Sequence, residues 1–201
     1  MHDPASFTDD ENWSGGFYEL AIEIGDRSDE LLQLGLSALW RAAAIDGCYG
    51  TRDREPGEQD DAACTVSSLA EFGHLRGTVT LPSGRRVVCG CLAIREDDGT
   101  DWLAFYLPVG ALSRVDAKIG GFPFGQDGGT VSLEWRRTLD NWLAAVGADI
   151  FQEVPFRLGL IGFELSGETR AEQLDGHAPE ERWEGYLLPA GGRLRFDPAN
   201  R

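Results

Sequence analysis

The sequence predicts an α+β fold, a single domain in which two main helices pack on a mostly antiparallel or mixed sheet of about six to seven strands. Short apolar segments that alternate as strands do are separated by turn residues. Two longer segments repeat their apolar residues at helical spacing instead. The expected order is β–α–βββ–α–β followed by a hairpin, and runs of strands broken by long helices indicate the α+β class.

The length and composition fit one domain. The chain has 201 residues, 42% hydrophobic and 26% charged, and a globular chain of this size needs no disulfide or metal to fold. We expect residues 1–13, MHDPASFTDDENW, to be an acidic flexible tail and residues 14–198 to form the domain. Within it, residues 50–63 are polar and acidic and contain Pro56 and Gly57, which predicts a mobile surface loop.

The first expected strand is 17–24, FYELAIEI. Its apolar residues alternate with polar ones, which is typical of a half-buried strand. Glu19 and Glu23 share the opposite face, about 13 Å apart at a strand's rise per residue. We expect both carboxylates to lie on a solvated face.

The first helix follows directly. Asp26 or Ser28 can cap it, and the two acidic residues after Ser28 suit the positive end of its dipole. Its apolar side chains recur at spacings of three and four over residues 32–43, and we expect the helix to end near Gly47.

Three strands come next, after a short helical segment at 66–72. Residues 74–81 turn at PSG into 85–96, and DDGT leads into 101–109. Turn residues between short apolar runs predict an antiparallel meander. The middle strand is apolar on both faces, so we expect it inside the sheet with a layer on either side.

The second helix has the clearest periodicity in the chain. Its apolar positions are Val131, Trp135, Leu139, Trp142, Val146 and Ile150. Their spacing of three and four residues predicts one buried stripe. Glu134 and Asp140 fall outside that stripe, and we expect both on the polar side of the helix.

Pro155 ends this helix because proline disrupts helical hydrogen bonding. Residues 156–165, FRLGLIGFEL, predict a buried strand. Residues 166–181 are polar and expected to be irregular, and 182–196 predict a final hairpin.

The net charge is −16, and it is unevenly distributed. Residues 1–61 hold fifteen acidic side chains and four arginines. A field of this sign repels phosphate backbones and anionic lipids, so we expect no nucleic-acid and no membrane partner. The charge serves solubility, or it forms an acidic face for a basic protein partner, including nucleic-acid mimicry.

Neither a signal peptide nor a membrane span is expected. The first thirteen residues lack a basic and an apolar region, and no apolar run approaches about 18 residues. The sequence therefore predicts a cytoplasmic protein. It does not indicate the oligomeric state.

The four cysteines do not match a metal site, and no metal or cofactor is expected. Cys89 and Cys91 project from one face of a strand, whereas structural zinc ligands are usually separated by two to four residues. We expect both to pack as small buried residues. A Cys48–Cys64 disulfide is an alternative that an oxidising compartment would favour.

Catalytic motifs are not evident, so we do not expect an enzyme, although histidine-based catalysis stays open. His74 is the histidine expected nearest the core, and a dyad with a cysteine would need a contact that the sequence cannot show. There is no glycine-flanked serine, histidine pair on a helix or phosphate-binding loop.

The candidate binding site is the loop IGGFPFGQDGG at residues 119–129. Phe122 and Phe124 have the same parity, so in an extended loop both rings would point the same way. Gln126 and Asp127 follow, and Trp135 lies in the helix that the loop enters. The rings either cover the end of the sheet or line a binding surface on a rigid scaffold.

Two functions therefore remain. The first is a non-enzymatic cytoplasmic protein, for example of the immunity or inhibitor type, that binds a protein partner through its acidic surface and the aromatic loop. The alternative is a small-molecule site, enzymatic or not, beside the loop, with His74, Gln126 and Asp127 as its polar groups. A third possibility is that the aromatic loop joins copies of this chain.

Overall fold

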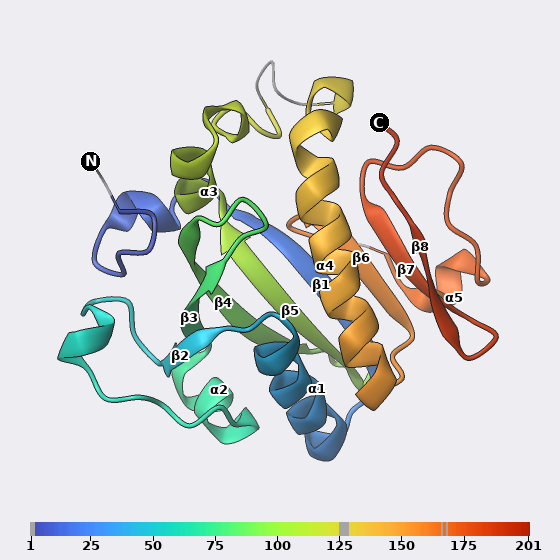
Figure 1. Ribbon diagram of the computed structural model, residues 1–201. Helices are drawn as coiled ribbons and strands as arrows, with labels where there is room; N and C mark the ends of the chain where they lie inside the picture. Colours follow the sequence, from blue (N-terminus) through green and yellow to red (C-terminus); the bar gives the residue numbers. More distant parts are fainter. Residues whose placement is uncertain (1–2, 125–128, 166, 168) are drawn as a thin grey trace.

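The computed structural model describes residues 3–124, 129–165, 167 and 169–201 (Figure 1). Gln126 and Asp127 lie outside the described residues. The fold is α+β, as predicted, with one antiparallel sheet of eight described strands in the order β2-β3-β4-β5-β1-β6-β7-β8. In chain order these are β1 (Phe17–Asp26), β2 (Asp46–Tyr49), β3 (Leu75–Thr80), β4 (Arg86–Arg95), β5 (Thr100–Pro108), β6 (Leu158–Phe163), β7 (Gly185–Ala190) and β8 (Arg193–Asp197).

The eight described strands are more than the six to seven expected. The additional strand is β2, whose four residues DGCY show no apolar alternation. It lies at the edge of the sheet and pairs with β3. Its conformation is set by that pairing and not by its own sequence pattern.

Over the described residues, two long helices are present, as expected, together with three short ones. The long helices are α1 (Asp29–Ala42) and α4 (Leu133–Glu153), and the short ones are α2 (Val66–Phe72), α3 (Val109–Val115) and α5 (Ala171–Leu174). The 3-10 turns are η1 (Asp10–Trp13), η2 (Pro56–Glu58), η3 (Ala117–Ile119) and η4 (Gly129–Val131). No helix in the described ranges combines the length and hydrophobicity that crossing a bilayer requires.

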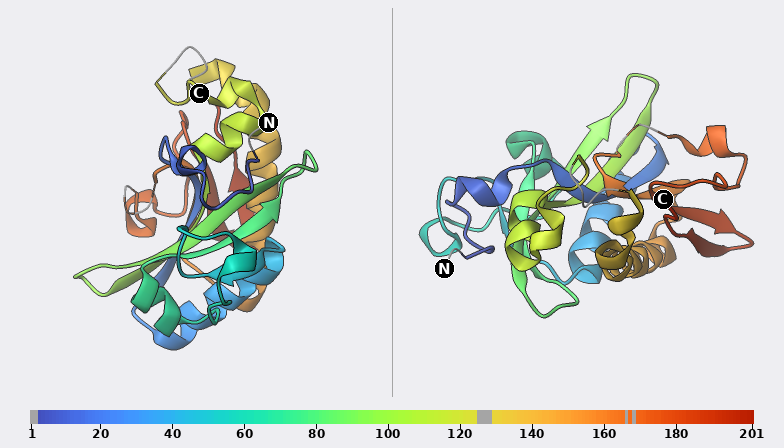
Figure 2. Two further views of the ribbon diagram at one scale, coloured as in Figure 1. Left: turned by 90° about the vertical axis from the view of Figure 1, so that its left-hand side faces the viewer. Right: turned by 90° about the horizontal axis from the view of Figure 1, so that it is seen from above.

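The sheet has a helix face and a back face. Figure 1 shows α1 and α4 side by side across the helix face, and Figure 2 shows α5 on the opposite side. On the helix face, Leu20 and Ile22 of β1 are buried in one apolar core with residues of both helices. Gly147 lets α4 lie close to the sheet, because a Cβ there would be 2.5 Å from Leu187 Cδ1.

Glu19 and Glu23 occupy the back face and are buried, at 3% and 4% exposure, so the expected solvated face is wrong. The Ala171 amide donates a hydrogen bond to Glu23 Oε2 at 2.8 Å, and the Leu165 amide donates to Glu19 Oε1 at 2.5 Å. Burial raises the pKa of Glu23, and the Ala171 hydrogen bond opposes that shift. Leu165 and Ala171 thus contact this part of the back face, a tertiary contact that strand alternation cannot reveal.

The N-terminal segment packs on the domain over its described residues. Phe7 is 1% exposed, with its ring 5.8 Å from Trp13 and 5.5 Å from Tyr49. The Glu55 carboxylate accepts hydrogen bonds from the Ser6 and Thr8 hydroxyls, each at 2.6 Å, and from the amides of Phe7 and Thr8.

The pKa of Glu55 reflects these contacts. Burial alone would raise it, but the hydrogen bonds from the N-terminal segment lower it to about 2. Glu55 therefore ties residues 3–13 to the acidic loop at 50–63. The mobility expected for the two segments stays a prediction, and their contacts include buried apolar side chains as well as polar ones.

Candidate functional site

An aromatic cluster forms where the chain enters α4. The ring of Phe122 lies 5.1 Å from Trp135, 5.9 Å from Tyr18 and 5.9 Å from Phe163, all at steep interplanar angles. Such edge-to-face pairs are the favoured arrangement of packed rings. The sheet places Tyr18 and Phe163 as direct neighbours on β1 and β6. Phe122 is therefore the anchor of the loop.

Phe124 is exposed to solvent, in contrast to this anchor. Its side chain is 91% exposed, and its ring lies 6.1 Å from Phe163. Residues 120–124 form consecutive turns and not an extended segment, so equal parity does not give the two rings one direction. The structure thus combines the two sequence interpretations, with one ring covering the sheet and the other facing solvent.

Two further apolar side chains are exposed at the start of α4. Val131 is 56% exposed and Trp183 is 61% exposed. A Cβ at Gly129 would lie 3.7 Å from the Trp183 ring, which places that ring against η4. We call Phe124, Val131 and Trp183 the entrance patch.

The sequence places Val131 in the buried stripe of the helix, and this is wrong because α4 begins at Leu133. The sequence does not indicate that Trp183 belongs to this surface, because Trp183 lies in a polar segment.

A cluster of buried polar side chains links the aromatic loop to Trp183. Arg136 Nε donates to the Tyr18 hydroxyl at 2.9 Å, and its terminal nitrogen donates to the Trp183 carbonyl at 2.6 Å. The Tyr18 hydroxyl in turn donates to Asp140. The Arg136 guanidinium also lies 5.5 Å from the centre of the Phe122 ring. This one side chain therefore connects the anchor of the loop with the backbone of Trp183.

Asp140 is 3% exposed, so its expected place on the polar side of the helix is wrong. Arg136 Nε lies 3.9 Å from Asp140 Oδ2 and is itself buried. The two residues are one helical turn apart. Each is a charged residue on the buried side of the helix, so the periodicity of the apolar residues does not predict its burial. Burial raises the pKa of Asp140 to about 6, against the opposing effects of Arg136 and of the Tyr18 hydrogen bond.

We expect this carboxyl to make the protein less stable as the pH rises from about 4 to about 6. In that window the unfolded chain has released the Asp140 proton and the folded chain still holds it, so unfolding releases a proton and becomes easier at higher pH. Asp140→Asn removes this dependence. Relative to wild type, its free energy of unfolding should gain about 2–3 kcal/mol across the window, measured by urea denaturation at several pH values. A constant difference between the two proteins would contradict the assignment.

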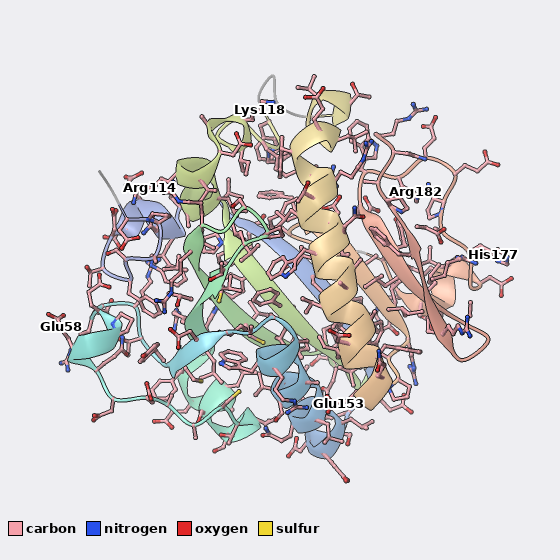
Figure 3. The ribbon with its side chains drawn as sticks, in the orientation of Figure 1. Glu58, Arg114, Lys118, Glu153, His177 and Arg182 are labelled. Atoms are coloured by element: carbon pink, nitrogen blue, oxygen red, sulfur yellow. The ribbon has the colours of Figure 1, made fainter. Side chains whose placement is uncertain are left out.

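A groove opens beside Trp135. It has a volume of about 290 Å³ and is lined by Leu81, Pro82, Ser83, Leu112, Val115, Asp116, Ile119, Glu134, Trp135, Thr138 and Leu139. The Trp135 indole N–H is buried and has no hydrogen-bond partner among the described residues. The lining is mainly apolar, with Asp116 and Glu134 as its carboxylates. Lys118, labelled in Figure 3 near the start of α4, lies 3.7 Å from Glu134.

His74 does not join the aromatic loop. Its Nδ1 lies 2.8 Å from the Tyr106 hydroxyl. Tyr106 pairs with Glu19 on β1, whereas Tyr18 of the aromatic cluster is the next residue along that strand. Adjacent strand residues point to opposite faces, so His74 contacts the back face and the aromatic loop contacts the helix face. His74 and the described part of the loop therefore lie on opposite faces of the sheet, and a site that also includes Gln126 and Asp127 stays a prediction.

The cysteines gather at one end of the sheet. Cys89 and Cys91 are fully buried on β4, and all four cysteines are free thiols. The hydrogen bond that the Cys48 thiol donates to Cys64, together with burial, raises the pKa of Cys48, and the same hydrogen bond lowers the pKa of Cys64. No set of three or more His, Cys, Asp or Glu side chains suited to a metal ion occurs in the part of the chain that is described.

No protein-family model matches this sequence, and the searches of curated proteins and of solved structures also found no match.

Proposed function

We propose that this chain is a non-enzymatic binding protein that engages a basic protein partner through the entrance patch and the adjoining groove. The observation that carries the proposal is the 91% exposure of Phe124 on a loop whose neighbouring ring is packed. An exposed aromatic side chain costs solubility, and on a supported loop it is typical of a recognition surface. Aromatic residues are also the usual anchors of protein interfaces.

The charge of the chain supports a basic partner. A net charge of −16 attracts a basic protein over a distance of about one Debye length and speeds encounter. In the groove, Asp116 and Glu134 stand among apolar side chains. This lining suits a partner segment with one apolar side chain next to a basic one. Immunity and inhibitor proteins that bind basic targets would use the same combination.

The test compares Phe124→Ser/Trp183→Ser with the matched control Leu34→Ser, which removes an apolar side chain 44% exposed on α1. Each protein is immobilised and incubated with native extract. We expect wild type and the control to retain one basic protein, whose capture weakens as salt rises, and the double variant to lose it. Equal capture by all three proteins would argue against the patch.

A second copy of this chain is the other macromolecule that could cover the patch. Sedimentation distinguishes the two. A wild-type species near 22.0 kDa agrees with a separate partner. A larger species that returns to this mass in the double variant would replace the proposed partner with a second copy.

A small apolar ligand is the alternative, and the unpartnered Trp135 indole N–H in the groove favours it. Such a ligand would place one hydrogen-bond acceptor on Trp135. Native mass spectrometry of the purified protein should then show an added mass that is lost in Thr138→Trp, because the larger side chain fills the groove. Wild-type protein without the added mass speaks against this alternative.

A further inference from the structure

A second cavity lies on the back face of the sheet, away from the entrance patch. It has a volume of about 260 Å³ and is lined by Trp13, Phe17, Arg52, His74, Arg76 and Tyr106. These residues come from η1, β1, the acidic loop, β3 with the residue before it, and β5, so distant parts of the chain build the cavity. We call it the basic pocket.

The charge of the basic pocket is opposite to that of the molecule. Two arginines and a histidine line it, and none of its described lining residues is acidic, in a chain of net charge −16. The carboxylate of Asp10 lies 4.0 Å from Arg52 and is 93% exposed. That pairing is weak because it is long and in water.

Arg76 is held in place but retains an unused donor. One terminal nitrogen donates to the Gly50 carbonyl at 2.7 Å. The Nε of the same side chain is buried and has no hydrogen-bond partner among the described residues. A buried donor left unpaired is unfavourable, and an oxyanion in the pocket would satisfy it.

Aromatic side chains position the basic groups of the pocket. The guanidinium groups of Arg52 and Arg76 each lie 5.9 Å from the centre of the Trp13 ring. The Tyr106 hydroxyl fixes the His74 ring through Nδ1, and His74 Nε2 makes no hydrogen bond within the described ranges. Burial, followed by the charges of Arg76 and Arg52, lowers the pKa of His74. The positive charge of the two guanidinium groups is therefore concentrated here without a compensating anion from the lining, and the lowered pKa favours a neutral His74 ring.

Aromatic surface completes the pocket. The rings of Phe17 and Tyr106 stack with centres 4.2 Å apart. Tyr106 lies over β4 at Gly90, where a Cβ would be 2.3 Å from the Tyr106 ring. A cavity of this size is slightly smaller than typical ligand sites. It suits one ring and one charged group.

We propose that the basic pocket binds a small aromatic oxyanion, a compound with a carboxylate or a phosphate on a single ring. The guanidinium groups of Arg52 and Arg76 and the His74 ring hold the oxyanion, and Trp13, Phe17 and Tyr106 contact the ring. Arginine suits this task because its planar fork matches both anions. A polyanion such as nucleic acid is repelled by the rest of the surface, whereas a small anion carries too few charges to be excluded.

The experiment titrates the full chain with phenyl phosphate, benzoate and inorganic phosphate by calorimetry. We expect one aryl anion to bind at least tenfold more tightly than inorganic phosphate, and the tighter of the two identifies the oxyanion. Arg52→Gln should weaken binding about tenfold, the effect of losing one charge-assisted hydrogen bond. Arg193→Gln on β8 makes the same change in net charge and should weaken it less than twofold. His74→Gln is a second variant within the pocket.

The Trp13 indole N–H locates the ligand, because it donates to the Phe7 carbonyl at 2.8 Å and reports on the pocket from a fixed position. Its NMR signal should shift on titration, while that of Trp135 should not. The proposal is overturned by a shift of Trp135 alone, by equal loss in Arg52→Gln and Arg193→Gln, or by no binding up to about 10 mM, well above a weak millimolar constant. Inorganic phosphate that binds as tightly as the aryl anions would also overturn it, as an adventitious ion only.

Discussion

Arg136→Met is expected to lower the free energy of unfolding by about 3–5 kcal/mol. Arg136 is 2% exposed and lies 3.9 Å from the buried carboxylate of Asp140. Its removal leaves that carboxylate without its cation, and it also leaves the Trp183 carbonyl without its donor. Urea denaturation near neutral pH measures the loss, where Asp140 is ionised in the wild-type fold.

Two comparisons make this result specific. Arg137→Met removes the same charge from the next residue, which is exposed, and should change stability by about 0.5 kcal/mol or less. Arg136→Met/Asp140→Asn should lose clearly less than Arg136→Met, because the unpaired charge is gone. If both arginine variants lose the same amount, the buried cluster does not stabilise the fold as described.

Phe7→Ala is expected to destabilise the protein by about 3–5 kcal/mol, a loss typical of a fully buried phenylalanine. Phe7 is 1% exposed and packs on Trp13 and Tyr49. Truncation of its ring removes the apolar contact between the N-terminal segment and the sheet. Thermal or urea unfolding of the full chain measures this effect.

The matched control is Phe124→Ala, the same substitution at a side chain that is 91% exposed. It should change the free energy of unfolding by about 0.5 kcal/mol or less. The two variants distinguish a phenylalanine that stabilises the fold from one that is exposed on the surface. A Phe7→Ala variant as stable as Phe124→Ala would show that residues 3–13 do not contribute to the fold.

The sequence predicts the fold class because most elements carry their own pattern. The alternation in β1 and the periodicity of α4 are local signals, and both elements are formed. Strand β2 has no such signal, since four residues without alternation depend on pairing with β3. Local patterns therefore predict long elements and miss short ones that tertiary contacts create.

The sequence also does not predict which charged residues are buried. Periodicity assigns Glu19, Glu23 and Asp140 to solvent, yet all three are buried. Hydrogen-bond donors from distant segments stabilise each buried carboxyl group, such as the Ala171 amide for Glu23 and the Tyr18 hydroxyl for Asp140. One sequence cannot reveal which segment will cover a charged face.

The contact between Phe122 and Trp135 agrees with the position of the aromatic loop before helix α4. That the loop is a binding site stays a prediction. His74 is on the other face because sheet register separates adjacent residues of β1. Trp183 also belongs to the entrance patch, although it lies 48 positions beyond Trp135 in the sequence. Their separation along the chain gives no indication that the two segments are close in space.

The entrance patch can be tested most directly by placing photoreactive benzoylphenylalanine at position 124 and, separately, at position 72. Phe72 is the matched site, an aromatic residue 39% exposed at the end of α2. Each protein is irradiated in native extract at low and at high salt. We predict that position 124 crosslinks one basic protein, less at high salt, and that position 72 does not. Equal crosslinking from both positions, or none from position 124, would contradict a binding surface at the entrance of α4.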